Sequence, residues 1–125
     1  MGCANYVATL LPHTPATENI LSEAEFAALK RNAVLINPGR GALLDDDALL
    51  GALDTGRLAA ATLDVFRTEP LPSDNPFWHH PNVTVTPHIA SVTRPDTAAN
   101  LIVENIHRSE NGKPLLHLVD RSRGY

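Results

Sequence analysis

The chain has 125 residues, 43% of them hydrophobic and 19% charged, which is typical of one globular domain with a modest core. Its net charge of −4 argues against nucleic-acid binding, and no apolar run approaches the roughly 18 residues needed to span a bilayer. Its single cysteine, Cys3, permits neither an internal disulfide nor a cysteine-built zinc site, so we expect a cytoplasmic protein without membrane or nucleic-acid partners.

Strands and helices alternate along the predicted chain. In chain order, strands are expected at 5–11, 33–37, 58–66 and 82–87, and helices at 23–31, 46–55 and 95–111. Ser22 and Glu25 form a capping box, and Asp45 is an N-cap residue. Gly56 and Gly112 are placed to end the second and third helices. This alternation predicts an α/β fold, a parallel sheet with flanking helices and right-handed crossovers.

A long loop separates the third and fourth predicted strands. Its sequence, RTEPLPSDNPFWHHPN, contains four prolines that forbid a regular helix. Loops of this length in a compact α/β unit are more often functional than idle. The N-terminus reads as a strand almost from residue 5, so we expect the sequence to begin inside a larger domain.

Ionisable side chains follow the ends of the predicted strands. Arg40 follows the second strand, Asp64 and then Glu69 follow the third, and His88 follows the fourth. Because parallel strands end at one edge of the sheet, where ligands of open α/β sheets bind, we expect these residues to gather. Arginine can bind a carboxylate or polarise a carbonyl, histidine can exchange a proton near neutral pH, and a neighbouring carboxylate would orient that histidine.

Other interpretations of these residues stay open at this point. A lone charged residue in a loop is usually solvated, and Asp64 could simply cap the next turn. Ser91, close after His88, suggests nucleophilic catalysis, but the sequence has no G-x-S-x-G elbow. His79 and His80 would point apart in an extended segment, and no H-x-x-x-H pair is present, so we expect no metal site.

Three segments together resemble the D-isomer-specific 2-hydroxyacid dehydrogenases. They are LKRNAVLINPGRGALLDDDAL, ATLDVFRTEPLP and NVTVTPHIASVT, in family order and at family-like spacing. The stretch NPFWHHPNVTVTPHIASVTRP and the ending VDRSRGY look most like the glyoxylate/hydroxypyruvate reductase A branch. The resemblance implies the C-terminal half of a Rossmann-like NAD(P)-binding domain over residues 1–112, followed by a C-terminal tail at 113–125.

The resemblance also implies roles for the matching residues. Arg40 corresponds to the arginine that binds the substrate carboxylate and ketone oxygen, His88 to the general acid/base, and Glu69 to its carboxylate partner. Trp78 would approach the substrate. The residues implied to contact NADP or NAD are Leu11, Pro12, Thr17, Asn37, Pro38, Gly39, Arg40, Asp64, His88 and Ala90, with Asp64 near the nicotinamide carboxamide. The implied protein is a homodimer that uses NADPH or NADH to reduce a small 2-keto acid such as glyoxylate or hydroxypyruvate.

One motif that the family needs is absent from these 125 residues. The only G-x-G, Gly39-Arg40-Gly41, lacks the third glycine of G-x-G-x-x-G and follows a later strand. We therefore expect its glycines to turn the backbone tightly and present Arg40, rather than cradle a phosphate. The alternative is a truncated, catalytically inactive cofactor-domain fragment that acts at most as a binding or self-associating module. A hydrolase built on Ser91 and His88 is a third hypothesis.

Overall fold

The computed structural model describes residues 2–124, which divide into two compact units. The first unit ends at Ala90 and contains the sheet, and the second begins at Ser91 and contains the last helix. These units are defined by contacts within each of them and do not test the predicted domain boundary. The division into 1–112 and 113–125 therefore stays a prediction.

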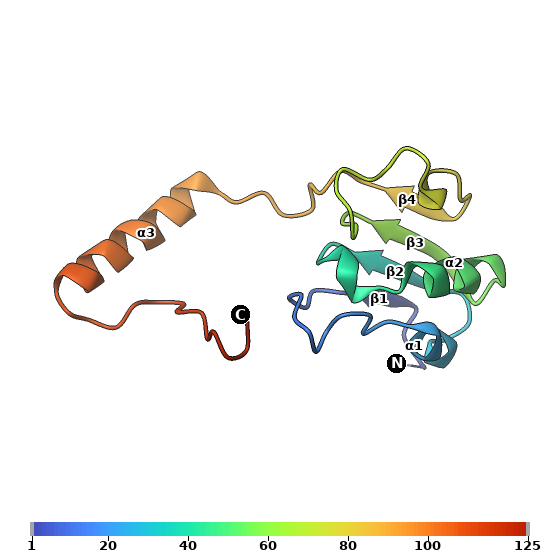
Figure 1. Ribbon diagram of the computed structural model, residues 1–125, viewed down its shortest axis with the longest axis horizontal. Helices are drawn as coiled ribbons and strands as arrows, with labels where there is room; N and C mark the ends of the chain where they lie inside the picture. The colour runs from blue at the N-terminus through green and yellow to red at the C-terminus, as the bar shows by residue number, and fades with distance from the viewer. Residues whose placement is uncertain (1, 125) are drawn as a thin grey trace. The chain divides into compact units, whose positions relative to one another are not determined.

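The first unit is built on a four-stranded parallel sheet in the order β1-β2-β3-β4 (Figure 1). The strands are β1 (Tyr6–Ala8), β2 (Ala33–Asn37), β3 (Leu58–Leu63) and β4 (Val83–Val85), and every neighbouring pair runs parallel. The predicted α/β class and parallel sheet are confirmed. The first, third and fourth strands end earlier than predicted, because the chain turns out of the sheet directly after the last paired residues. For example, the Asp64 amide still donates to the Asn37 carbonyl at 3.0 Å, and the chain then turns away.

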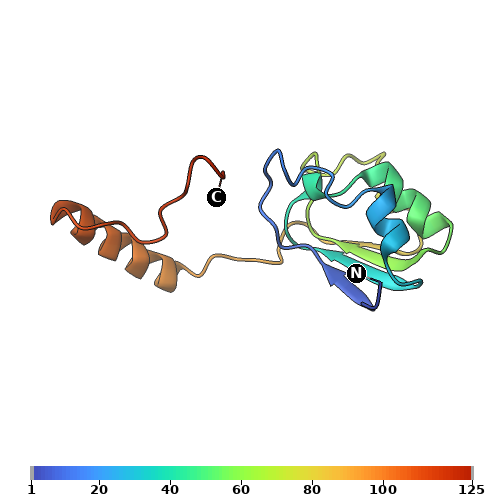
Figure 2. The ribbon, with the colours of Figure 1, turned by 90° about the horizontal axis from the view of Figure 1, so that it is seen from below.

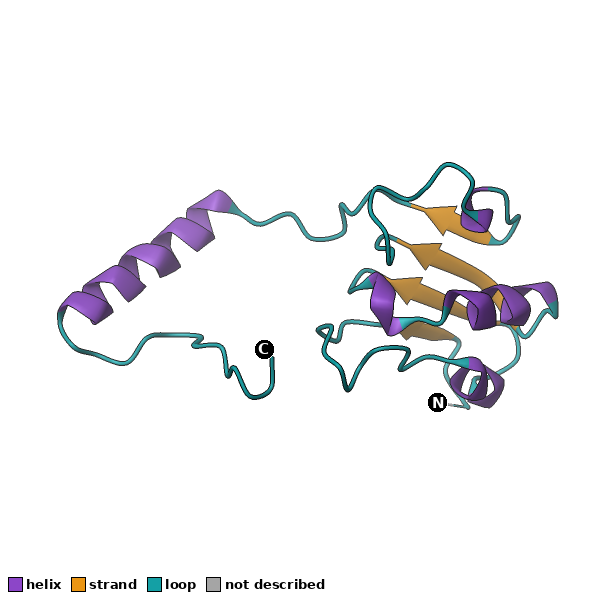
Figure 3. Cartoon of the chain, in the orientation of Figure 1, coloured by secondary structure: helices purple, strands orange, loops and turns teal. Residues whose placement is uncertain are grey.

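Two helices, α1 (Glu23–Ala28) and α2 (Asp46–Asp54), cover the same face of this sheet (Figure 2; Figure 3). The predicted capping box is confirmed, since the Glu25 carboxylate accepts from the Ser22 amide at 3.1 Å and from its hydroxyl at 2.6 Å. The Asp45 carboxylate caps α2 by accepting from the amide of Ala48 at 3.0 Å. Helix α1 ends earlier than predicted because Leu29 adopts an extended conformation and is buried in the core.

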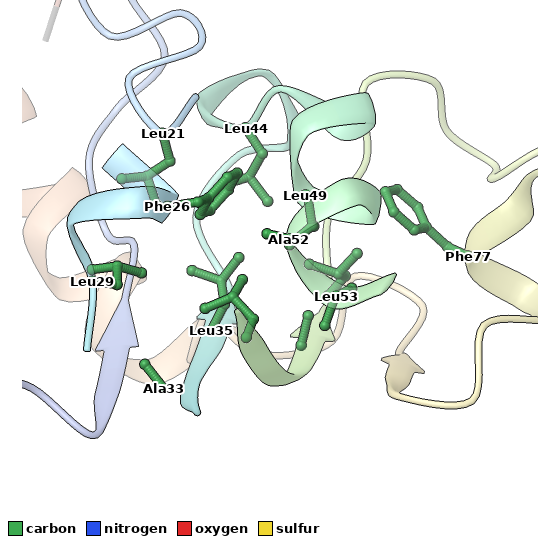
Figure 4. Close-up of a cluster of buried hydrophobic side chains, with 13 residues drawn as sticks. Leu21, Phe26, Leu29, Ala33, Leu35, Leu44, Leu49, Ala52, Leu53 and Phe77 are labelled. Carbon is green, nitrogen blue, oxygen red and sulfur yellow. The ribbon is translucent and has the colours of Figure 1, made fainter. Parts of the chain in front are cut away.

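The hydrophobic core lies between the sheet and these two helices (Figure 4). Leu35 from β2 and Leu63 from β3 meet Phe26 from α1 and Leu49 from α2, and all four are almost completely buried. Each contributes roughly 1.5–3 kcal/mol by removal of apolar surface from water. Phe77 closes the core from the long loop, in the short 3₁₀ helix η2 (Pro76–Trp78). This packing leaves the carboxyl ends of the strands available for a functional site.

The second unit consists of α3 (Pro95–Glu110) and the segment that follows it. The helix starts and ends as predicted, with Gly112 at a φ of +63° just beyond it. The Asn105 side chain ties the tail to the helix, because it accepts from the Leu116 amide at 2.8 Å and donates to its carbonyl at 3.3 Å. In the described range 2–124, every helix is too short or too polar to traverse a bilayer.

Candidate functional site

The four ionisable residues predicted to gather all follow carboxyl ends of parallel strands. Arg40 comes after β2, Asp64 and Glu69 come after β3, and His88 comes after β4. Figure 1 shows the segments after these strands leaving the sheet at the same edge. The topology therefore brings the candidate residues together, as expected for the ligand-binding edge of an open α/β sheet.

His88 and Glu69 form a direct pair in this group. The Nδ1 atom of His88 lies 2.7 Å from Oε2 of Glu69, and Oε1 of Glu69 accepts from the Phe66 amide at 2.8 Å. The hydrogen bond to His88, then the Phe66 amide and the charge of Arg40 hold the pKa of Glu69 below its usual range. An ionised Glu69 favours the proton on Nδ1, so Nε2 of His88 is the nitrogen left for a ligand.

Asp64 is buried and holds the segment that carries His88. Its Oδ1 accepts from the Thr86 hydroxyl at 2.5 Å and from the Ile89 amide at 3.0 Å, while Oδ2 accepts from the Ala90 amide at 2.8 Å. Burial alone would raise the pKa of Asp64, but these hydrogen bonds outweigh it and hold the pKa below its ordinary value. The donors lie on both sides of His88, whose φ of +55° is uncommon for a residue other than glycine.

The turn between β2 and η1 (Gly41–Leu43) presents Arg40. Asn37 is fully buried, and its Oδ1 accepts from the Thr9 hydroxyl at 2.6 Å and from the Gly39 amide at 3.1 Å. Its amide nitrogen donates to the Arg40 carbonyl at 3.1 Å. A Cβ on Gly39 would lie 2.8 Å from the Thr9 carbonyl oxygen, and a Cβ on Gly41 would overlap the backbone that follows β3. Both glycines thus permit close backbone packing, while the Arg40 side chain stays exposed.

An apolar cavity of about 510 Å³ adjoins the His88–Glu69 pair. Its walls are formed by Phe66, Glu69, Pro70, Leu71, Trp78, Val85, Thr86, Pro87 and His88. The indole Nε1 of Trp78 donates to the Pro72 carbonyl at 2.9 Å, which fixes the ring against the proline-rich loop. Trp78 thus lines the same cavity as the pair, and its implied approach to a substrate stays a prediction. Sequence reasoning missed Phe66, Leu71 and Val85, for which apolar character beside the T-E-P and T-P-H motifs was the available signal.

The residues predicted to contact a cofactor fall into an exposed and a buried group. Leu11 is 46% exposed, and Thr17 shapes its loop by donating to the Pro12 carbonyl at 2.7 Å. Asn37 and Asp64 are buried with their side chains hydrogen-bonded inside the protein. These two residues support the site by fixing the backbone segments around them, because their side-chain oxygens are already hydrogen-bonded within the protein. A direct cofactor contact from Asn37 does not fit its complete burial.

The remaining predicted cofactor residues, Pro38, Gly39 and Ala90, lie in the segments that Asn37 and Asp64 fix. The Gly39 amide donates to the Asn37 side chain, and the Ala90 amide donates to the Asp64 carboxylate. Within residues 2–124, no three His, Cys, Asp or Glu side chains come close enough to hold a metal ion.

Comparison with known proteins places the chain among relatives of one kind. Residues 1–90 match the family described as D-isomer specific 2-hydroxyacid dehydrogenase, NAD binding domain. A glyoxylate/hydroxypyruvate reductase A of Yersinia enterocolitica is 54% identical over 116 residues, which cover 93% of this chain and 37% of that protein. The chain thus spans little more than a third of the length of the curated relatives that it matches.

Solved structures agree with this match. The D-isomer specific 2-hydroxyacid dehydrogenase of Xanthobacter autotrophicus Py2 in complex with NADPH and MES has 50% identity and a TM-score of 0.93, over 97% of this chain and 50% of that one. The NADPH-dependent glyoxylate/hydroxypyruvate reductase of Sinorhizobium meliloti in complex with NADP and sulfate has 42% identity and a TM-score of 0.93, over 99% of this chain and 41% of that one. The chain therefore belongs to the D-isomer-specific 2-hydroxyacid dehydrogenase family, and its residues 1–90 match that family's NAD-binding domain.

Proposed function

We propose that the site in this chain serves the reduction of a small 2-keto acid, such as glyoxylate or hydroxypyruvate, to the 2-hydroxy acid with NADPH or NADH. The observation that carries the proposal is the 2.7 Å contact between His88 and Glu69 at the sheet edge that also presents Arg40. An acid/base pair beside a permanent cation suits a substrate that has both a carboxylate and a carbonyl group. The names of the relatives support the choice of substrate class.

Each residue of the site has a part in this reaction. Arg40 binds the substrate carboxylate and stabilises the negative charge that develops on the carbonyl oxygen. His88, protonated at Nε2, donates its proton to that oxygen, while Glu69 at Nδ1 stabilises the charged ring. A nicotinamide cofactor, when bound, would supply the hydride. Asp64 fixes the backbone on both sides of His88, so the proton donor is held in one place.

The exposed residues beyond the strand ends fit the outer parts of a dinucleotide. Leu11 offers apolar surface after β1, and the hydrogen bonds of Thr17 fix the loop beside it. We propose that Leu11, Pro12 and Thr17 line the adenosine side of NADP or NAD, and that Pro38, Gly39 and Ala90 lie nearer the nicotinamide. Structures of relatives that contain NADPH or NADP support the class of cofactor.

The isolated chain is expected to turn over glyoxylate feebly or not at all, because a G-x-G-x-x-G loop for the diphosphate is not among its residues. A robust, protein-dependent loss of nicotinamide absorbance with glyoxylate and NADPH would contradict this expectation. If no turnover and no ligand binding are found, the inactive binding or self-associating module is the better description. The homodimer and the cytoplasmic location remain predictions.

A binding experiment tests the site without requiring turnover. Oxalate, an unreactive dicarboxylate that resembles glyoxylate, is titrated into the ¹⁵N-labelled chain while the side-chain signals of Arg40 and His88 are followed. We expect saturable shifts at both residues, loss of binding in Arg40→Gln, and unchanged binding in the control His79→Gln, an exposed histidine of the long loop. Equal binding by wild type and Arg40→Gln would remove Arg40 from the proposal.

A further inference from the structure

Arg67 lies where three segments of the ligand-binding edge meet. Its Nη2 donates to the Asn19 side-chain oxygen, to the Leu44 carbonyl and, at 3.4 Å, to the Ala42 carbonyl. Its Nη1 lies 3.6 Å from Oε1 of Glu18, and its Nε lies 3.9 Å from Oδ1 of Asp46. One guanidinium thus connects the segment after β3 to the loop before α1 and to the segment that follows Arg40.

The two segments that Arg67 joins also pair with each other through the backbone. The Asn19 amide donates to the Ala42 carbonyl at 2.9 Å, and the Leu21 amide donates to the Leu43 carbonyl at 3.1 Å. Figure 1 shows this loop beside the segment around η1. Asn19 has a φ of +52°, so the loop takes a conformation that needs support from its surroundings. Arg67 adds that support from a third segment.

The same third segment carries the acid/base pair. Gly41 packs directly on the backbone of Phe66 and Arg67, where a Cβ would overlap the main chain. The Phe66 amide in turn donates to Glu69, which holds His88. The Phe66–Arg67 segment therefore contacts the turn that presents Arg40 on one side and Glu69 on the other. The Arg67 guanidinium stabilises the contact with the turn, because it donates to the Ala42 and Leu44 carbonyls.

We propose that Arg67 is a positioning residue, which sets the place of Arg40 relative to the Glu69–His88 pair and so controls the binding of the substrate carboxylate. The inference rests on the proposed function, because it takes Arg40 as the carboxylate-binding group. The three uncharged acceptors all lie around Nη2, while Nη1 and Nε face Glu18 and Asp46. A lysine has one nitrogen on a differently shaped side chain, so it can replace only part of this set of contacts. An isolated surface ion pair would contribute little, so the ion pairs to Glu18 and Asp46 are the lesser part.

Arg57 provides a matched control at the opposite edge of the sheet. It too satisfies backbone carbonyls with one guanidinium, namely those of Phe26, Ala27 and Leu29 at the end of α1. Its removal should loosen α1 without moving Arg40. The variants to compare in the full chain are Arg67→Met, Arg67→Lys and Arg57→Met.

The first measurement is amide hydrogen exchange of the paired groups Asn19, Leu21 and Asp45. In Arg67→Met we expect their exchange to rise roughly tenfold or more, since the loss of hydrogen bonds to a charged group opens these segments. Arg67→Lys should show a smaller rise than Arg67→Met, because its ammonium can still donate to some of the same oxygens, whereas Arg57→Met should leave these amides unchanged. Unchanged exchange in Arg67→Met, or an equal rise in Arg57→Met, would each overturn the proposal.

The second measurement is the dissociation constant of oxalate. If Arg67 only stabilised the fold, Arg67→Met would not weaken oxalate binding more than Arg57→Met does. Arg67→Met should raise the dissociation constant of oxalate by roughly tenfold and alter the Arg40 side-chain shifts, as expected when a charged hydrogen bond is misplaced. Arg57→Met should bind oxalate like wild type. Unaltered oxalate affinity in Arg67→Met would contradict the role of Arg67. If the wild-type chain binds no oxalate, the proposed function fails at that step, and the exchange experiment decides about Arg67 by itself.

Discussion

Replacing Asp64 by asparagine keeps the shape of the side chain and removes the charge that holds the His88 segment. In the wild type, Oδ1 serves two donors and Oδ2 serves the Ala90 amide at 2.8 Å. The asparagine oxygen can take over the first position, but its NH₂ group then faces the Ala90 N–H, donor against donor. One hydrogen bond to a charged acceptor is lost, which costs about 1.5–3 kcal/mol. Because Ala90 is exposed and water can partly replace the acceptor, we expect a loss of about 2 kcal/mol.

Urea denaturation followed by Trp78 fluorescence measures this loss, since the only tryptophan of the chain lies in the sheet unit. Asp74→Asn, which neutralises an exposed carboxylate in the loop after β3, is the matched control and should change stability by less than about 0.5 kcal/mol. The Ala90 amide should exchange faster in Asp64→Asn only. A stability equal to that of the control, together with an unchanged Ala90 amide, would refute the reasoning.

The pH dependence of this difference follows from the lowered pKa of Asp64. Hydrogen bonds from Thr86 and two amides outweigh the effect of burial, so the folded protein holds the ionised form more firmly than the unfolded chain does. The stabilisation is therefore fully present above the ordinary pKa of 3.8 and is lost as the pH falls through the lower pKa of the folded state. The stability gap between wild type and Asp64→Asn should shrink on acidification, and a gap that widens would contradict the assignment.

Two further substitutions test neighbouring parts of the site. Gly41→Ala places a methyl group against the backbone after β3 and should lower the free energy of unfolding by about 3 kcal/mol or more. Gly51→Ala, which has free space around it in α2, should raise that free energy by about 0.5–1 kcal/mol. Equal stabilities of the two variants in urea denaturation would be inconsistent with the packing described. Glu69→Gln should change the ring ¹⁵N shifts of His88 at neutral pH, because the ionised partner of Nδ1 is lost, and unchanged shifts would show that the pair does not form in solution.

The fold could be predicted largely because its signals are local or follow from topology. The Ser22–Glu25 capping box, Asp45 as N-cap and Gly56 at a φ of +66° lie within a few residues of the helix ends that they determine. The grouping of charged residues needed one additional rule, that strands separated by helices run parallel and end at a common edge. The lengths of β1, β3 and β4 were predicted too long. Apolar residues continue beyond the last ladder pair of β1 and β3, and Thr86 and Pro87 follow that of β4, so the sequence pattern cannot show where pairing stops.

The hydrogen bonds inside the site could not be predicted from the sequence. The Thr9–Asn37 pair joins residues 28 positions apart, and the contact of Arg67 with Asn19 spans 48. Such partners meet only after the sheet has formed, and neither threonine nor arginine in a loop carries a periodic signal of its partner. Without the structure, Asn37 is taken as a cofactor contact, and nothing in the sequence singles out Arg67.

The supporting residues explain why short motifs mark this site so well. Within N-x-x-R-G, Asn37 donates to the Arg40 carbonyl and so shapes the turn that exposes the charged side chain. Within T-P-H, the Thr86 hydroxyl bonds to Asp64, whose other contacts lie just beyond His88. Each motif thus contains an ionisable group and a polar side chain whose hydrogen bonds help to fix the backbone nearby. A substitution at Asn37 or Thr86 should therefore impair the site as a displaced Arg40 or His88 would, because Asn37 is buried and the Thr86 hydroxyl is bonded to Asp64.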